Sequence, residues 1–208
     1  MTSFAEEAHN MICRLSHKNT SIMGWLLSAV VVLAGCAGSS SYTPLQSPPG
    51  TATTFILVRH AEKIDSSAES PLSDTGRKRA VILADTLAPM GITAIYCPAL
   101  TRNLETVQPL ADRLGLEIHS IPGWQLLNTR RFARRFVEEA FTKHAGGTVV
   151  WAGNSSAVGN WGSNLQELYQ ILGGQGEGPR AYSDLFIITV GDDGFPHIQK
   201  RRYGESVP

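Results

Sequence analysis

Two arginines and a histidine stand where the sequence predicts the ends of buried strands. Arg59 and His60 directly follow the apolar run Phe55–Val58, and Arg102 follows a second predicted strand at 92–96. Neutral imidazole forms covalent intermediates, and the planar guanidinium fork binds phosphate in bidentate fashion. Ligands of open α/β sheets sit beyond the carboxyl ends of the strands. These residue types therefore predict a phosphate pocket at that edge of a sheet.

The elements that would position these residues alternate between strand and helix. Phe55–Val58 is continuously apolar, as expected of a strand buried on both faces. Ser73 is a plausible N-cap, and Gly115 is a typical helix end. We expect strands near 55–58, 92–96, 117–121, 148–152, 184–190 and 197–203, and helices near 73–87, 98–115, 128–144 and 161–172. This alternation predicts an α/β fold, a three-layer αβα arrangement with a mostly parallel central sheet.

Size and charge limit the classes of function. The chain has 208 residues, with 18 Lys+Arg against 18 Asp+Glu, so no overall field favours nucleic acid. The length suits one α/β domain with additional segments, and we expect a monomer. Of the three cysteines, only Cys97 lies in the predicted domain, which leaves no disulfide framework there. Cys97 itself is interpreted as a small buried hydrophobic residue.

Three segments together resemble a known family. Arg59-His60-Ala61-Glu62 resembles the Arg-His-Gly/Ala signature of the histidine phosphatase (phosphoglycerate mutase-like) superfamily, in particular its short phosphohistidine-phosphatase-like branch. The segment 71–76 resembles the Leu-Ser/Thr-x-x-Gly start of a family helix. The segment 97–106 resembles the family's Ser-x-x-x-x-Arg-x-x-x-Thr element, with Arg102 in the arginine position. The likeness extends over roughly residues 54–203.

The resemblance implies a mechanism and a set of site residues. His60 would attack phosphorus to form a phosphohistidine that water then hydrolyses, and Arg59 and Arg102 would hold the phosphoryl oxygens. It implies no metal and no cofactor. Glu62 and Asp65 are the nearest carboxylates for a general acid, although both are more typical of loop residues. Glu62 is expected to support substrate binding by orienting Arg59.

One departure from the family pattern concerns Asn154. The family has a second histidine in a Gly-His-Ser-Asn-Thr-type turn, where this chain reads Gly153-Asn154-Ser155. Asparagine donates hydrogen bonds to a phosphoryl oxygen but carries no positive charge and shuttles no proton. The expected substrate is a phosphorylated small molecule or an envelope phosphosugar. We predict either a slow phosphatase or a relative that binds phosphorylated ligands without turnover.

The amino-terminal segment is typical of a bacterial lipoprotein. A basic stretch precedes an apolar run over 22–35, which ends on Leu33-Ala34-Gly35-Cys36, a sequence similar to a lipobox. We expect a signal peptide over 1–35, lipid attachment at Cys36, a Ser/Pro-rich tether over 36–51 and the domain over 52–208. Ala37 favours the outer membrane, with the domain facing the periplasm. A short uncleaved anchor is the alternative.

A serine esterase is a second alternative. The turn around Ser155 approximates a nucleophile elbow, with Asp184, Asp192 or Asp193 as acid and His197 as base, in the chain order of an α/β-hydrolase. The second glycine of that motif is absent, and this scheme leaves the Arg-His pair unexplained.

Four arginines near the start of the predicted helix 128–144 also need an interpretation. Arg130 and Arg134 share one helix face, as do Arg131 and Arg135. They fit a solvated surface, with an anionic substrate or lipid headgroups as the other reading.

Overall fold

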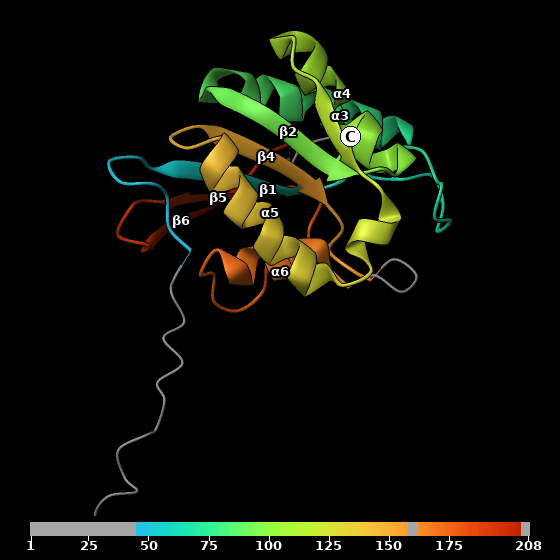
Figure 1. The fold of residues 1–208 in the computed structure, drawn as a ribbon. Helices are drawn as coiled ribbons and strands as arrows, with labels where there is room; N and C mark the ends of the chain where they lie inside the picture. Colours follow the sequence, from blue (N-terminus) through green and yellow to red (C-terminus); the bar gives the residue numbers. More distant parts are fainter. Residues whose placement is uncertain (1–44, 158–161, 205–208) are drawn as a thin grey trace, which may run out of the picture. The chain divides into compact units, whose positions relative to one another are not determined.

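The computed structural model describes residues 45–157 and 162–204 (Figure 1). The predicted signal peptide and the predicted lipid attachment at Cys36 lie outside these residues. Within them, no helix combines the length and the apolar character that crossing a bilayer requires.

Strands and helices alternate along most of the described chain. In chain order they are β1 (Thr53–Arg59), α3 (Asp74–Leu87), the 3-10 helix η1 (Ala88–Met90), β2 (Ile92–Pro98), α4 (Thr101–Leu114), β3 (Ile118–Ile121), the 3-10 helix η2 (Gly123–Leu126), α5 (Thr129–Lys143), β4 (Thr148–Gly153), α6 (Asn164–Ile171), β5 (Asp184–Val190) and β6 (Pro196–Arg202). Every predicted element is present. The starts of α4 and α6 differ most from the predicted bounds: α4 begins at Thr101, and α6 begins at Asn164 because the Ser163 side chain accepts from the Gln166 backbone N–H and caps the helix.

The described strands form one six-stranded sheet in the order β3-β2-β4-β1-β5-β6. The first four are parallel to one another, whereas β5 runs antiparallel to both β1 and β6. In the register of β1 with β4, Arg59 pairs with Gly153. The residues that follow these two strands therefore emerge side by side at the carboxyl edge.

Helices cover both faces of the sheet, with α3 and α4 on one side and α5 and α6 on the other (Figure 1). Alternate residues of β1 explain this arrangement. Phe55 and Leu57 belong to the core under α5 and α6, and Ile56 and Val58 belong to the core under α3 and α4. Because both faces of the central strands are buried, they read as continuous apolar runs. The predicted three-layer α/β fold is confirmed.

The folded unit begins earlier than the predicted residue 52. Ser47 is buried, its backbone N–H donates to the Gly191 carbonyl at 3.0 Å, and its hydroxyl lies 2.8 Å from that of Thr53. The Gly50 N–H donates to the Asp192 carboxylate at 2.8 Å. The last part of the predicted tether, 45–51, therefore packs on the β5–β6 turn. Composition alone misplaced this boundary, because Pro and Ser also form such ordered turns.

Candidate active site

Three chain segments meet at the carboxyl edge of the sheet. The His60 backbone N–H donates to the Gly153 carbonyl at 3.0 Å, which joins the residues after β1 to the end of β4. Asn154 follows β4, and Arg102 lies in the first turn of α4, just after β2. Arg102 Nη2 donates to Asn154 Oδ1 at 3.1 Å. The predicted convergence of Arg102 and Asn154 beside His60 is therefore what the structure shows.

His60 is buried and held in one orientation. Its Nδ1 lies 2.8 Å from the Ala61 carbonyl oxygen, which can only accept, so Nδ1 carries the proton and Nε2 is left as a lone-pair donor. Burial lowers the pKa of His60 to about 4, and the nearby charges of Arg102, Arg59 and Lys63 add to this effect against the Ala61 hydrogen bond. The ring is therefore neutral at pH 7, as a nucleophile requires.

The His60 ring is expected to titrate near pH 4 instead of near 6.5. Because the charged form is disfavoured in the folded state, the ring stays neutral as the pH falls through 6 and gains its proton only near 4. NMR titration of the ring C–H resonance, assigned as the signal that is missing in His60→Ala, measures this pKa. A midpoint at or above 6.5 would contradict the described environment.

Arg102 is almost inaccessible, with 2% of its surface exposed. One of its Nη atoms donates to the Ala68 carbonyl and the other to Asn154, while Nε has no partner among the described residues. Thr106, one turn further along α4, accepts from the Ala61 N–H at 2.9 Å and donates to the Arg102 carbonyl at 2.6 Å. Thr106 thus ties the helix that carries Arg102 to the turn that carries His60.

Asn154 is 1% exposed, and the turn around it is rigidly hydrogen-bonded. Asn164 Oδ1 accepts from the Asn154 N–H at 2.9 Å and from the Trp151 indole at 3.0 Å. A Cβ on Gly153 would lie 2.2 Å from that same oxygen, so only glycine fits there. Asn154 Nδ2 has no hydrogen-bond partner among the described residues. A buried amide donor without a partner is costly, and an oxygen atom of a bound anion would satisfy it.

Arg59 is held by a residue that sequence reasoning missed. Its guanidinium carbon lies 4.0 Å from the centre of the Tyr182 ring, Nη2 donates to the Tyr182 hydroxyl at 3.3 Å, and Nη1 donates to the Arg180 carbonyl at 2.9 Å. The same ring lies 5.9 Å from that of His60. Tyr182 precedes β5, far along the chain in a Gly/Pro-rich stretch without periodicity, so no local signal pointed to it.

Glu62 does not orient Arg59, which corrects the expectation for this carboxylate. Its two oxygens accept from Arg79 Nε at 2.8 and 2.9 Å, and Arg79 Nη2 lies 2.7 Å from Oε1. Arg79 is buried, and this pairing raises its pKa although burial opposes it. Glu62 is therefore a structural partner of α3 and is not a substrate ligand in this arrangement. Asp65, the other nearby carboxylate, accepts from the Ser67 N–H at 2.7 Å.

Gly76 explains why the segment 71–76 is tied to the site. A Cβ at Gly76 would lie 2.1 Å from the Glu62 carbonyl oxygen, so the first turn of α3 packs directly on the backbone after His60. The Ser73 N–H donates to the same oxygen at 2.9 Å, and the Ser73 hydroxyl caps α3. The glycine thus permits the close approach that supports the turn after His60.

The serine esterase alternative is wrong for the described structure. Ser155 lies just beyond the carboxyl end of β4. His197 pairs through β5 with Thr54 at the amino end of β1, and Asp192 and Asp193 lie in the turn before it. The length of β1, about 15 Å or more at 3.3 Å per residue, separates this edge from Ser155. The proposed base therefore cannot reach the proposed nucleophile.

The sheet is mostly parallel, and a neutral histidine, arginines and a buried amide gather at its carboxyl edge. This α/β arrangement is suited to binding an oxyanion. The chain belongs to the histidine phosphatase superfamily (branch 1), whose family model matches residues 55–170.

Known relatives agree with this assignment. The chain is 32% identical over 90 residues to the curated protein named Probable phosphoglycerate mutase GpmB of Yersinia enterocolitica, over 40% of this chain and 42% of that protein. The crystal structure of phosphoglycerate mutase from Bacillus anthracis is similar with a TM-score of 0.56 and 14% identity, over 73% of this chain and 93% of that one. The protein histidine phosphatase SixA, complexed with tungstate, is similar with a TM-score of 0.53 and 14% identity, over 72% and 96%. At these identities, the likeness to the two structures shows a shared fold only.

Proposed function

We propose that this protein is a phosphatase that hydrolyses phosphomonoesters through a phosphohistidine on His60. His60 Nε2 attacks phosphorus, the bond from phosphorus to the ester oxygen breaks, and the alcohol leaves with a proton from solvent. Water then attacks phosphorus, the P–N bond breaks, and inorganic phosphate leaves. The observation that carries this proposal is the neutral, uncommitted Nε2 of His60 beside the pair formed by Arg102 and Asn154.

The charged and polar groups around His60 fit the charge that develops on the phosphoryl group. Arg102 and Arg59 supply fixed positive charge, and Asn154 Nδ2 supplies a donor that has no hydrogen-bond partner in the described part of the chain. Preorganised donors of this kind are usually the largest contribution to catalysis. Glu62 is paired with Arg79 and does not serve as a general acid for the leaving group, so substrates with good leaving groups are favoured. We therefore expect aryl phosphates and phosphoramidates to be hydrolysed faster than alkyl phosphates.

Asn154→His is expected to raise kcat/KM for an aryl phosphate by about 10- to 100-fold. A lost active-site donor typically costs about 10²–10³ in rate, and asparagine retains part of it. Asn154→Leu, which keeps the approximate size but removes both hydrogen-bonding groups, is the matched variant and should lower kcat/KM. Steady-state kinetics on a panel of phosphomonoesters measures both effects.

If neither Asn154 variant changes turnover, the role given to this residue is wrong. The same substitution also tests the non-catalytic alternative. If both the parent chain and Asn154→His bind tungstate but hydrolyse no substrate, the protein is a module that binds phosphorylated ligands. In that case His60 and the arginines would serve recognition alone.

We also propose that the protein is anchored to the bacterial envelope through a lipid on Cys36, with the domain in the periplasm at the outer membrane. The lipobox-like sequence before Cys36 supports this, and it makes a phosphorylated small molecule or an envelope phosphosugar the expected substrate. Cys36→Ser is expected to abolish labelling by radioactive palmitate in the native host and to move the protein from the membrane to the soluble fraction. Unchanged labelling would reject the anchor.

A further inference from the structure

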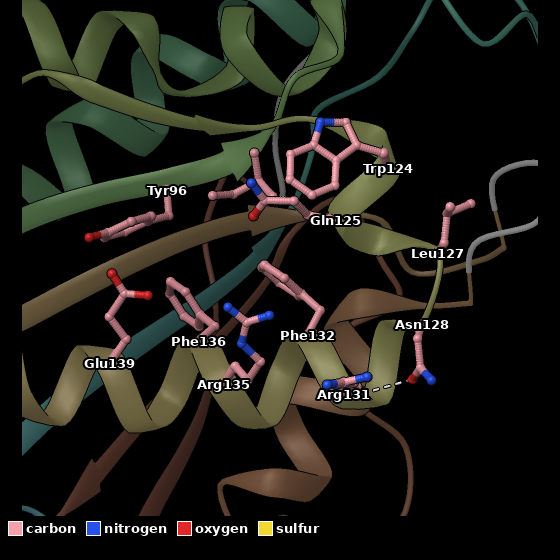
Figure 2. Close-up of a pocket in the computed structure, with 11 residues that line it drawn as sticks. Tyr96, Trp124, Gln125, Leu127, Asn128, Arg131, Phe132, Arg135, Phe136 and Glu139 are labelled. Atoms are coloured by element: carbon pink, nitrogen blue, oxygen red, sulfur yellow. Dashed lines mark hydrogen bonds between the residues drawn. The ribbon is translucent and has the colours of Figure 1, made fainter.

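A concave site lies between α5 and the chain that leads from β3 through η2 (Figure 2). It encloses about 670 Å³, within the range of small-molecule sites. Its lining includes none of the residues of the candidate active site, which are Arg59, His60, Arg102 and Asn154. The lining residues come from β2, from the end of β3, from η2 and the turn after it, and from α5.

The floor of this groove is aromatic. The Phe132 and Phe136 rings are stacked at 5.9 Å, and Tyr96 meets Phe136 edge-on at 5.0 Å. Trp124 stands across from the two phenylalanines in Figure 2, with 70% of its surface exposed. An exposed indole opposite a ring-lined floor offers apolar surface to a further ring, because aromatic rings bury a large area and pair favourably when stacked or edge-on.

The charges in the groove are unbalanced. Arg131 and Arg135 line it one helical turn apart, and neither side chain makes an ion pair or hydrogen bond with the described residues. The acidic residue of the lining, Glu139, is already paired with Lys143. The groove therefore presents two guanidinium groups without a carboxylate of their own. A guanidinium fork beside apolar surface is suited to a carboxylate, sulfonate or phosphate.

We propose that this groove binds a small anionic amphiphile, with an apolar, ring-sized body between Trp124 and Phe132 and its anionic group on Arg131 and Arg135. Charge complementarity selects the anion, and the aromatic floor selects an apolar body over a simple ion. This assigns two of the four arginines of α5 to ligand binding. Arg134, which pairs with Glu138 at 3.0 Å, belongs to the solvated face instead. The inference does not depend on phosphatase activity.

Two fluorescent probes of similar shape test the proposal on the full chain. One is 8-anilinonaphthalene-1-sulfonate, which carries an anionic group, and the other is the neutral N-phenyl-1-naphthylamine. The double variant Arg131→Gln/Arg135→Gln is expected to weaken sulfonate binding about tenfold or more, since charge-assisted hydrogen bonds are lost, and to leave binding of the neutral probe unchanged. Trp124→Ala should weaken both probes.

The matched control is Arg201→Gln, which removes one exposed arginine from β6 and should leave both affinities unchanged. His60→Ala should also leave them unchanged, which separates this groove from the catalytic pocket. The proposal is overturned if the double variant binds the sulfonate as tightly as the parent chain. It is also overturned if Arg201→Gln or His60→Ala weakens sulfonate binding as much as the double variant does. Near-UV circular dichroism checks that each variant keeps its packing.

Discussion

Replacing His60 with alanine is expected to lower hydrolysis of an aryl phosphate by about 10³-fold or more, because the covalent route through phosphohistidine is lost. Two buried described residues do not replace the imidazole: Asn154 is not a nucleophile, and Cys97 has its pKa raised to about 12, so it stays a thiol. Steady-state kinetics gives the loss. Reactions quenched in alkaline detergent should contain base-stable, acid-labile phosphate on the parent protein and none on His60→Ala.

The control for this experiment is His197→Ala, which removes an exposed histidine at the opposite edge of the sheet and should leave both readouts unchanged. Tungstate binding by His60→Ala shows whether the variant keeps its anion site. A variant that binds tungstate but is inactive has lost its nucleophile, as expected. Retained turnover in His60→Ala would reject His60 as the attacking group.

Arg102→Ala is expected to raise the tungstate inhibition constant and to lower kcat/KM, each by about 10²–10³-fold, the usual loss for an oxyanion-stabilising group. The effect is large because Arg102 is buried and places its guanidinium against Asn154 Oδ1. Arg102→Lys should recover only part of it, since the ammonium group is a point charge and does not reproduce the fork. The tungstate inhibition constant is the direct measurement.

Arg113→Ala is the matched control, because Arg113 lies on the same helix but faces solvent and pairs with Asp85. Its tungstate affinity should equal that of the parent chain. If Arg102→Ala and Arg113→Ala bind tungstate equally well, Arg102 does not contact the anion and the proposed pocket is wrong.

The strands, the helices and most of the site could be predicted from the sequence because their signals are local. Continuous apolar runs mark β1 and β4, since both faces of these strands are buried. The parallel register then brings Arg59 and Gly153 level, which places His60 beside Asn154. Cys97 is confirmed as a small buried hydrophobic residue.

The contacts that were missed all join residues far apart in the chain. The stacking of Tyr182 on Arg59 depends on the antiparallel placement of β5 next to β1, which no periodicity encodes. Arg79 was not distinguished from other polar residues of its helix, although its position decides where Glu62 points. Long-range pairing of this kind is invisible to reasoning about composition, spacing and local turns.

The buried pair of Arg79 and Glu62 has a consequence for the end of the described chain. Arg79 Nη1 also donates to the Gly204 carbonyl at 2.8 Å and to that of Tyr203 at 3.4 Å. One guanidinium therefore connects the residues just after β6 to Glu62, in the turn that follows His60. Removing the chain from Tyr203 onward would remove the Arg79 contacts that support this turn. Catalysis would then be weakened, although none of the groups proposed to face the phosphate is altered.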